Sequence, residues 1–248
     1  MLKLPPLVTR KSNQQAVKNA TEAWAAENLY CPKCLGKLAV LKANVEVKDF
    51  DCLKCKETYQ LKARKTSIGK TITGADYFCM RQAIVGNTHP SIFLLQYDPK
   101  TGFVLNVLAI HKHCISVSCL KKNKSPVKGR PGKYLSKFLL PKILRSGRVP
   151  IVSFGNEIPK KTVKRLWADA ESISEVMSSY RHGWKRELVL YIDQLGTSFR
   201  TEDAYGCAAR LKRKFPNNKT VKEKIRQVLR DLMREGLIRS TRREHYER

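Results

Sequence analysis

Two cysteine pairs constrain this chain more than any other feature of its sequence. Cys31-Pro-Lys-Cys34 is followed, after seventeen residues, by Cys52-Leu-Lys-Cys55. This spacing is typical of a zinc ribbon, because each C-x2-C turn presents two thiolates to one point and two turns complete a tetrahedral shell. We therefore predict one structural zinc held by Cys31, Cys34, Cys52 and Cys55, at the connection between two short strands.

The remaining cysteines lack ligand spacing; they are Cys79, Cys114, Cys119 and Cys207. Cys79 and Cys207 lie in helix-like segments, where a free cysteine is usually a small core residue. Cys114 and Cys119 follow His111 and His113, so a second metal site is an alternative there to plain strand and loop positions. Because the N-terminal segment 1–11 has no apolar core or small-residue cleavage site, we expect no secretory signal and a reducing cytoplasmic setting.

The composition points to a polyanionic partner. The 248 residues carry a net charge of +28, and 42% of them are hydrophobic, which is enough to build a core. The chain has no run of eighteen apolar residues, so we expect no membrane span. Such a charge repels itself unless a polyanion neutralises it, and nucleic acid is the usual one. A solvated basic surface or ribosome association is the alternative.

The first part of the chain is expected to be mixed α/β. Apolar periodicity and turn signals predict a small sheet with flanking helices. The expected helices cover 12–28, 72–84 and 160–180, and the expected strands cover 39–48, 58–63, 92–97 and 103–110.

A basic segment lies between the last of these strands and the third helix. Residues 99–156 contain twelve Lys or Arg and no Asp or Glu. Their centre, 121–132, is rich in Lys, Gly and Pro and predicts a flexible loop. We expect this loop, through Lys128 and Arg130, to contact the DNA backbone; a loop that is merely solvated is the alternative.

The last stretch predicts a winged helix. Helices are expected at 184–195, from Thr201 to Phe215, and from Asn217-Asn218 to Gly236, with a hairpin over 237–246. The third helix would bury Val221, Ile225, Val228, Leu229 and Leu232, and would expose Lys219, Glu223, Arg226, Gln227 and Arg230. We expect DNA contacts from Asn218, Lys219, Arg226 and Arg230. A dimerising helical bundle is the alternative. Because periodicity lapses over 178–183, we divide the chain into domains 1–180 and 181–248.

A candidate active site adjoins the second cysteine pair. Gln60 and Lys62 lie two residues apart on one predicted strand, so both face the same side, whereas Leu61 faces the core. With Asp49 they form a D-x10-Q-x-K pattern whose carboxylate, amide oxygen and lysine suit metal-assisted phosphodiester hydrolysis. Three unrelated surface residues would give the same pattern. Glu22, in the first helix, is either an outer carboxylate or a solvated helix residue.

These residues resemble the DpnI or Dam-replacing protein family over nearly the whole chain. The matching positions include Thr21-Glu-x-Trp24, Cys31-Pro-x-Cys34, Asp49-Phe-x-Cys52-x-x-Cys55, Leu61-Lys62 and Val221-Lys-Glu-Lys-Ile-Arg-Gln227 with Leu229 and Asp231. The resemblance implies a PD-(D/E)xK nuclease domain with an inserted four-cysteine zinc site and a C-terminal winged helix. It also implies a prokaryotic type II restriction endonuclease that cleaves double-stranded DNA at GATC when the adenine is N6-methylated.

The resemblance also assigns roles to the candidate residues. Asp49 would bind Mg²⁺, with Mn²⁺ able to substitute, and Lys62 would be the catalytic lysine. Gln60 stands where the family pattern has Glu; from its residue type we expect it to bind the metal, with the Leu61 carbonyl as a further ligand. Tyr134 falls near a family tryptophan that packs the methylated base. We expect this activity to need no protein partner.

Two other functions fit the same residues. A non-enzymatic zinc and winged-helix transcription regulator would bind DNA without Mg²⁺-dependent nicking. A nuclease with another target, or with no methyl requirement, would cut methylated and unmethylated plasmids alike.

Overall fold

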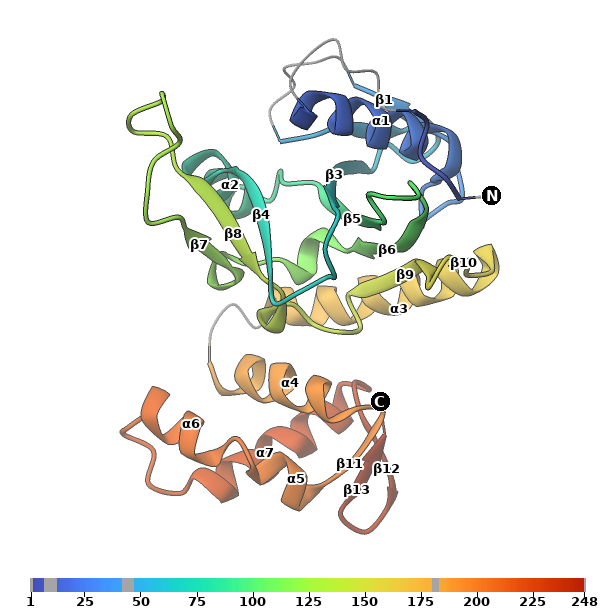
Figure 1. The fold of residues 1–248 in the computed structure, drawn as a ribbon. Coiled ribbons are helices and arrows are strands. Elements are labelled where there is room, and N and C mark those ends of the chain that lie inside the picture. The colour runs from blue at the N-terminus through green and yellow to red at the C-terminus, as the bar shows by residue number, and fades with distance from the viewer. Residues whose placement is uncertain (1, 7–12, 42–46, 180–182, 248) are drawn as a thin grey trace. The chain divides into compact units, whose positions relative to one another are not determined.

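The computed structural model describes residues 2–6, 13–41, 47–179 and 183–247 (Figure 1). The chain forms two compact units. The first comprises Met1–Ile143 and Gly147–Glu171, and the second comprises Leu144–Ser146 and Ser172–Arg248.

The first unit is built on two sheets. Its helices are α1 (Asn13–Asn28), α2 (Tyr77–Val85) and α3 (Lys160–Ser179), of which α3 continues into the second unit. Its strands are β1 (Leu38–Val40), β2 (Phe50–Cys52), β3 (Thr58–Arg64), β4 (Thr71–Asp76), β5 (Ser91–Tyr97), β6 (Val104–Ile110), β7 (Leu120–Lys122), β8 (Leu135–Leu139), β9 (Arg148–Ser153) and β10 (Asn156–Glu157). Short 3-10 turns are η1 (Lys112–Cys114), η2 (Val117–Cys119) and η3 (Leu140–Lys142).

The larger sheet has the strand order β1-β2-β3-β5-β6-β9-β10. Its β3 and β5 run parallel, and the other neighbours are antiparallel. Residues 92–95 of β5 are at most 1% exposed, since a central strand covered on both faces carries a continuous apolar run. The predicted strands over 58–63, 92–97 and 103–110 are confirmed by β3, β5 and β6.

Helices α1 and α3 supply the aromatic centre of the core. Ala16, Ala20 and Trp24 recur every four residues on α1 and are all buried, as the periodicity predicts. Trp24 and Trp167 of α3 belong to one buried cluster with residues of the larger sheet. Tyr59 stacks on Phe93 with ring centroids 4.5 Å apart. The expected helices over 12–28 and 160–180 are thus confirmed within the residues described.

The predicted helix over 72–84 is wrong in its first turn and a half. Residues 71–76 form β4, which pairs with β8 in the sheet β4-β8-β7. Gly74 allows this pairing, because a Cβ there would overlap Ser136 and Phe138 of β8. The Asp76 carboxylate then accepts from the amides of Phe78 and Cys79 and starts α2. Cross-strand packing overrides the local helical pattern.

Two further boundaries differ from expectation. The predicted strand 39–48 ends early: β1 stops at Val40, residues 42–46 lie outside the described part, and Val47 has a left-handed φ of 69°. Pairing of Val40 with Phe50 places Val47 and Lys48 in the connection between β1 and β2. The expected loop over 121–132 begins two residues late, because Lys121 and Lys122 pair with β8.

We expect one buried histidine to make the first unit sensitive to acid. His111 is 1% exposed and packs edge-on against Trp167, with ring centroids 4.8 Å apart. Burial lowers its pKa from 6.5 to about 4; His113, Lys112 and Lys33 act in the same direction, and Glu171 opposes them. As pH falls below 6.5 the unfolded chain therefore binds a proton before the folded chain does, so stability is lost.

We expect this histidine to cost roughly 1 kcal/mol of unfolding free energy between about pH 7.5 and about pH 5.5. His111→Asn removes the titration while keeping an acceptor for the His113 amide, which now donates to Nδ1 over 3.3 Å. Denaturant unfolding at both pH values, for wild type and variant, gives the difference. An equal loss of stability in the two proteins would contradict the prediction.

The second unit is a winged helix. Its elements are α4 (Trp184–Leu195), β11 (Ser198–Arg200), α5 (Thr201–Tyr205), α6 (Ala208–Lys214), α7 (Val221–Arg234), β12 (Arg239–Arg242) and β13 (His245–Glu247). The predicted hairpin is confirmed by β12 and β13, and β11 adds a third strand in the order β11-β13-β12. The first and third predicted helices match α4 and α7, and Gly236, with a φ of 71°, follows the end of α7.

The second predicted helix is divided. Arg200, not Thr201, occupies the capping position, and α5 ends before Gly206 while α6 begins at Ala208. A Cβ on Gly206 would overlap the Tyr191 hydroxyl, so glycine leaves room for this side chain of α4 beside the bend. Helical periodicity does not report such a tertiary contact.

Helix α7 has the expected two faces. Ile225, Val228, Leu229 and Leu232 are buried, whereas Val221 is only half-buried. The residues predicted on the opposite face are all exposed; they are Lys219, Glu223, Arg226, Gln227 and Arg230. In the described parts of the chain, no helix is both long and apolar enough to cross a membrane.

Candidate active site and metal centre

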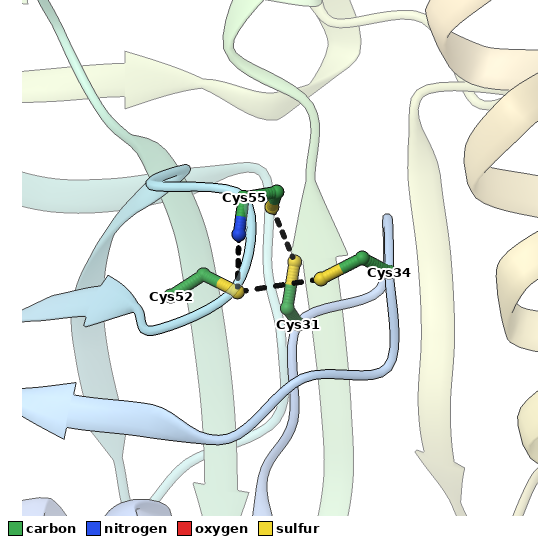
Figure 2. A group of neighbouring side chains, drawn as sticks. All are labelled: Cys31, Cys34, Cys52 and Cys55. Atoms are coloured by element: carbon green, nitrogen blue, oxygen red, sulfur yellow. Dashed lines mark hydrogen bonds between the residues drawn. The ribbon is translucent and has the colours of Figure 1, made fainter.

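The four predicted zinc ligands come together from two matching turns (Figure 2). In the first, the Leu35 amide donates to the Cys31 carbonyl over 2.8 Å; in the second, the Lys56 amide donates to the Cys52 carbonyl over 3.0 Å. Leu35 and Lys56 both have a left-handed φ, of 60° and 61°. Each turn thereby points its two cysteines at the same place.

The sulfur positions suit a tetrahedral ion. Cys31 and Cys55 Sγ are 3.5 Å apart, Cys34 and Cys52 Sγ are 3.3 Å apart, and all four lie within 4.8 Å of one another. Thiolates around a zinc ion at about 2.3 Å lie about 3.8 Å apart. A Cβ on Gly36 would crowd Lys54 and two of the sulfurs, so glycine keeps the space open. The cluster therefore fits zinc.

The cysteine cluster is tied to the larger sheet through Tyr59. The Tyr59 hydroxyl lies 3.1 Å from Cys31 Sγ, and burial raises the pKa of that thiol. Tyr59 is on β3 directly before Gln60. A second metal site at Cys114 and Cys119 is not supported: among the described residues, the four-cysteine cluster is the one group of three or more His, Cys, Asp or Glu placed to hold an ion.

The predicted catalytic residues line one cleft of about 1140 Å³. Asp49, Gln60, Leu61 and Lys62 form one wall, and Glu22 of α1 joins them. The wall is built by the junction of β2 with β3, because the Asp49 amide donates to the Tyr59 carbonyl over 2.9 Å. Residues far apart in sequence thus meet at one surface.

Asp49 and Gln60, which both carry side-chain oxygen atoms, line this cleft. The Leu61 amide donates to Asp49 Oδ2 over 2.7 Å, which orients the carboxylate against β3. Gln60 is only 4% exposed, and its Oε1 is buried without a hydrogen-bond partner. A buried acceptor left unpaired costs about 1–3 kcal/mol. Such an atom fits the ligand position of a cation.

The ionisable groups of the cleft influence one another. Burial lowers the pKa of Lys62, which Asp49 and Glu22 raise and Lys18 lowers further. Burial raises the pKa of Glu22, with Lys18 and Lys62 acting against this shift and Asp49 adding to it. A lysine with a lowered pKa beside carboxylates suits proton transfer to or from water.

The predicted DNA contacts of the first unit lie in and beside the β7–β8 connection. Lys128 and Arg130 are exposed. Tyr134 is half-buried, with Lys122 Nζ 4.2 Å from its ring centroid and the Phe78 ring 6.4 Å away, edge-on. Phe78, which is 49% exposed, was not among the predicted site residues, because its place beside Tyr134 follows from packing of α2 against β8.

The predicted contacts of the second unit lie on α7 and in the turn before it. Lys219, Arg226 and Arg230 are exposed, and Asn218 is half-buried, with its Oδ1 accepting from the Thr220 amide over 2.9 Å. Arg226 packs over the Tyr205 ring at 5.6 Å, a stacking partner that the sequence pattern did not reveal. The aromatic ring restrains a cation on the exposed face of α7.

Comparison with known families matches both parts of the chain. The Dam-replacing family matches residues 6–176, and the Dam-replacing HTH domain matches residues 180–248. The first match alone covers more than half of the chain, and the family implies a restriction endonuclease. The winged helix of the second unit agrees with the HTH match, which implies DNA binding. The chain therefore belongs to the Dam-replacing family of restriction endonucleases and carries the DNA-binding HTH domain of that family.

Proposed function

We propose that this protein is a Mg²⁺-dependent, methyl-directed type II restriction endonuclease of the PD-(D/E)xK type. Its substrate is double-stranded DNA with N6-methyladenine in GATC. The observation that supports this best is the shared cleft: Asp49, Gln60 and Lys62 line it, and Gln60 offers a buried oxygen without a partner. Incubation with matched methylated and unmethylated plasmids, with and without Mg²⁺, tests the proposal directly.

The oxygen donors of the cleft fit a hard cation. Mg²⁺ prefers one or two carboxylates, keeps several waters and binds phosphate oxygens of its substrate. Asp49 supplies the carboxylate, Gln60 Oε1 a neutral oxygen, and the Leu61 main-chain carbonyl a third donor. When bound, the ion would polarise the scissile phosphate and acidify a water molecule.

Lys62 performs the remaining chemistry. Its ammonium group stabilises the negative charge that builds up on the phosphate oxygens, and its lowered pKa suits it to exchange a proton with the attacking water. The Asp49 carboxylate is oriented by the Leu61 amide. Its negative charge favours the protonated form of Lys62 and so raises the pKa of that lysine against the effect of burial. The zinc held by the four cysteines is structural, because four thiolates leave no open position for substrate.

DNA contacts are divided between domains 1–180 and 181–248. Lys128 and Arg130 contact the backbone, and Tyr134, with Phe78 and Lys122 beside it, packs against the methylated base. Asn218, Lys219, Arg226 and Arg230 contact the duplex from the winged helix. Such an enzyme acts in the cytoplasm of a prokaryote and needs no protein partner.

A second function needs its own test because Gln60 replaces a carboxylate. A site with one charge fewer attracts Mg²⁺ less strongly. If cleavage were lost altogether, the chain would be a methyl-DNA-binding regulator. DNA binding without nicking at every Mg²⁺ and Mn²⁺ concentration would favour this function.

We expect methylated GATC plasmid to be cut at least about 10-fold faster than unmethylated plasmid. One methyl group in an apolar pocket gives only about 0.8 kcal/mol, or roughly fourfold. A larger difference between the two cleavage rates therefore requires that both domains recognise the methylated site. Tyr134→Ala and Arg226→Ala should each reduce the ratio of the two cleavage rates, and both together should reduce it further. Equal cutting of the two plasmids by wild type would show that the protein does not recognise the methyl group.

The basic loop, taken as the whole connection between β7 and β8 from Asn123 to Tyr134, should contribute salt-dependent affinity. Replacing Lys124, Lys128 and Lys133 by glutamine should weaken binding to all DNA sequences and flatten the plot of log K against log salt by about one unit per lost phosphate contact. Lys100, Lys161 and Lys164, also exposed, serve as the matched triple control. Fluorescence anisotropy at several salt concentrations gives both slopes. Identical slopes for the loop variant and wild type would show that the loop does not touch DNA.

A further inference from the structure

Helix α1 contributes an acidic side chain to the active-site cleft. Two stripes run along this helix. The stripe that contains Ala16, Ala20 and Trp24 is buried in the core, and the adjacent one lines the cleft with Val17, Lys18, Thr21 and Glu22. Because the first stripe is fixed by packing, the second is held against the cleft. Glu22 is therefore a wall residue and not a solvated helix residue.

The Glu22 carboxylate interacts electrostatically with the proposed catalytic residues Asp49 and Lys62. Its side chain is 23% exposed, and its Oε1 lies 3.5 Å from Lys18 Nζ. The charges of Asp49 and Lys62 both act on the Glu22 carboxyl group, and the charge of Glu22 acts in turn on Lys62. The carboxylate thus shares its electrostatic environment with the two residues that carry the proposed chemistry.

The cleft otherwise lacks charge for a divalent cation. Of the proposed ligands on β3 and before β2, only Asp49 is anionic, because Gln60 offers a neutral amide. The unpartnered Gln60 Oε1, in a side chain 4% exposed, independently marks the ligand position on the same wall. A divalent ion is bound more tightly when a second negative charge lies nearby.

We propose that Glu22 is the second carboxylate of the metal site, supplying from α1 the negative charge that Gln60 does not. The inference rests on the proposed function, since it assigns a further residue to the same metal. It makes the placement of α1 against β3 a requirement for metal binding. Lys18, paired with Glu22, holds the carboxylate in place when metal is absent.

Calorimetric titration of the full chain with MnCl2 tests this without relying on cleavage. Glu22→Gln should weaken Mn²⁺ binding about 10-fold or more, whereas Glu27→Gln, on the exposed side of the same helix and outside the cleft, should leave it unchanged. Gln60→Glu should tighten binding. The double variant Glu22→Gln/Gln60→Glu should return to nearly wild-type affinity, because the number of carboxylates is restored.

Several outcomes would overturn the inference. Unchanged Mn²⁺ affinity in Glu22→Gln would do so, and so would a double variant as weak as Glu22→Gln alone. If Glu22→Gln failed to fold, Glu22→Ala, which a helix tolerates, would be titrated with the same expected loss. A wild type that binds Mn²⁺ and cuts methylated DNA while Glu22→Gln binds equally well refutes only this inference. A wild type that neither binds Mn²⁺ nor cuts refutes the proposed function as well.

Discussion

Replacing Asp49 or Lys62 by alanine is expected to abolish cleavage of methylated plasmid while DNA binding persists. Loss of one preorganised charge at a phosphoryl-transfer site reduces the rate by roughly 10²–10³-fold or more. Binding should persist because phosphate contacts are distributed over the basic loop and the winged helix. Cleavage kinetics and anisotropy on the same DNA measure the two properties separately. Equal loss of binding and cleavage would indicate misfolding instead of a catalytic role.

Lys62→Met is the sharper form of this experiment. It removes the ammonium group and keeps an apolar chain of similar length. Since burial opposes the charge of Lys62, the variant should be inactive yet at least as stable as wild type. A Lys62→Met protein that still cuts would exclude Lys62 from catalysis.

Under the proposed function, Gln60 should determine how much metal the enzyme needs. With Gln60 as a neutral ligand, wild type should require a high Mg²⁺ concentration or work better with Mn²⁺, which binds mixed ligands more tightly. Gln60→Glu should lower the concentration for half-maximal cleavage, because it adds a full negative charge. Superimposable Mg²⁺ titrations would show that Gln60 is not a ligand. Cleavage found only in Gln60→Glu would mean that the wild-type chain binds methylated DNA without cutting it.

Removal of the proposed structural zinc should strongly destabilise the first unit. Purified protein should contain about one zinc per chain, and chelation or Cys52→Ala should cost several kcal/mol of unfolding free energy in the first unit. We expect loss of the zinc to displace the candidate active site as well. Tyr59 connects the two sites, because its hydroxyl contacts Cys31 and the next residue is Gln60. Cleavage should therefore fall together with stability.

Cys119→Ala is the matched control for the zinc experiment. Cys119 is as buried as Cys52, but it lies outside the four-cysteine cluster, with its thiol donating to the Lys142 carbonyl over 3.1 Å. We expect it to lose only about 1 kcal/mol and to keep its zinc. Zinc analysis and thermal unfolding distinguish the two variants. Folded protein with no zinc, or a Cys52→Ala variant of wild-type stability, would contradict the metal assignment.

Local patterns in the sequence determined most elements of this protein. The C-x2-C spacing predicted the four-cysteine cluster, because two short turns place their thiolates by local geometry alone. The apolar runs on either side of Asp98–Gly102 predicted the paired strands β5 and β6. Helical periodicity predicted α1, α3, α4 and α7, with the buried and exposed faces of α7. In each case the signal lies within a few turns or one strand pair.

Only the tertiary structure decided where helical and strand signals compete. Thr71–Asp76 became a strand because β8 lies beside it and Gly74 permits the approach. The helix expected after Thr201 is interrupted between Tyr205 and Ala208, and the Tyr191 hydroxyl there fills the space that a Cβ on Gly206 would take. Both places involve partners that lie well outside the local sequence window.

The candidate site was predictable as a set of residues but not as an arrangement. The period of two along β3 placed Gln60 and Lys62 on one face, yet their distance from Asp49 depends on how β2 pairs with β3. The place of Glu22 in the cleft follows from packing of α1 against β3, and the burial of Gln60 Oε1 without a partner is likewise visible only in the tertiary structure. The sequence indicates which side chains are candidates for the chemistry, whereas long-range packing determines which of them share one cleft, because charge and burial act through space.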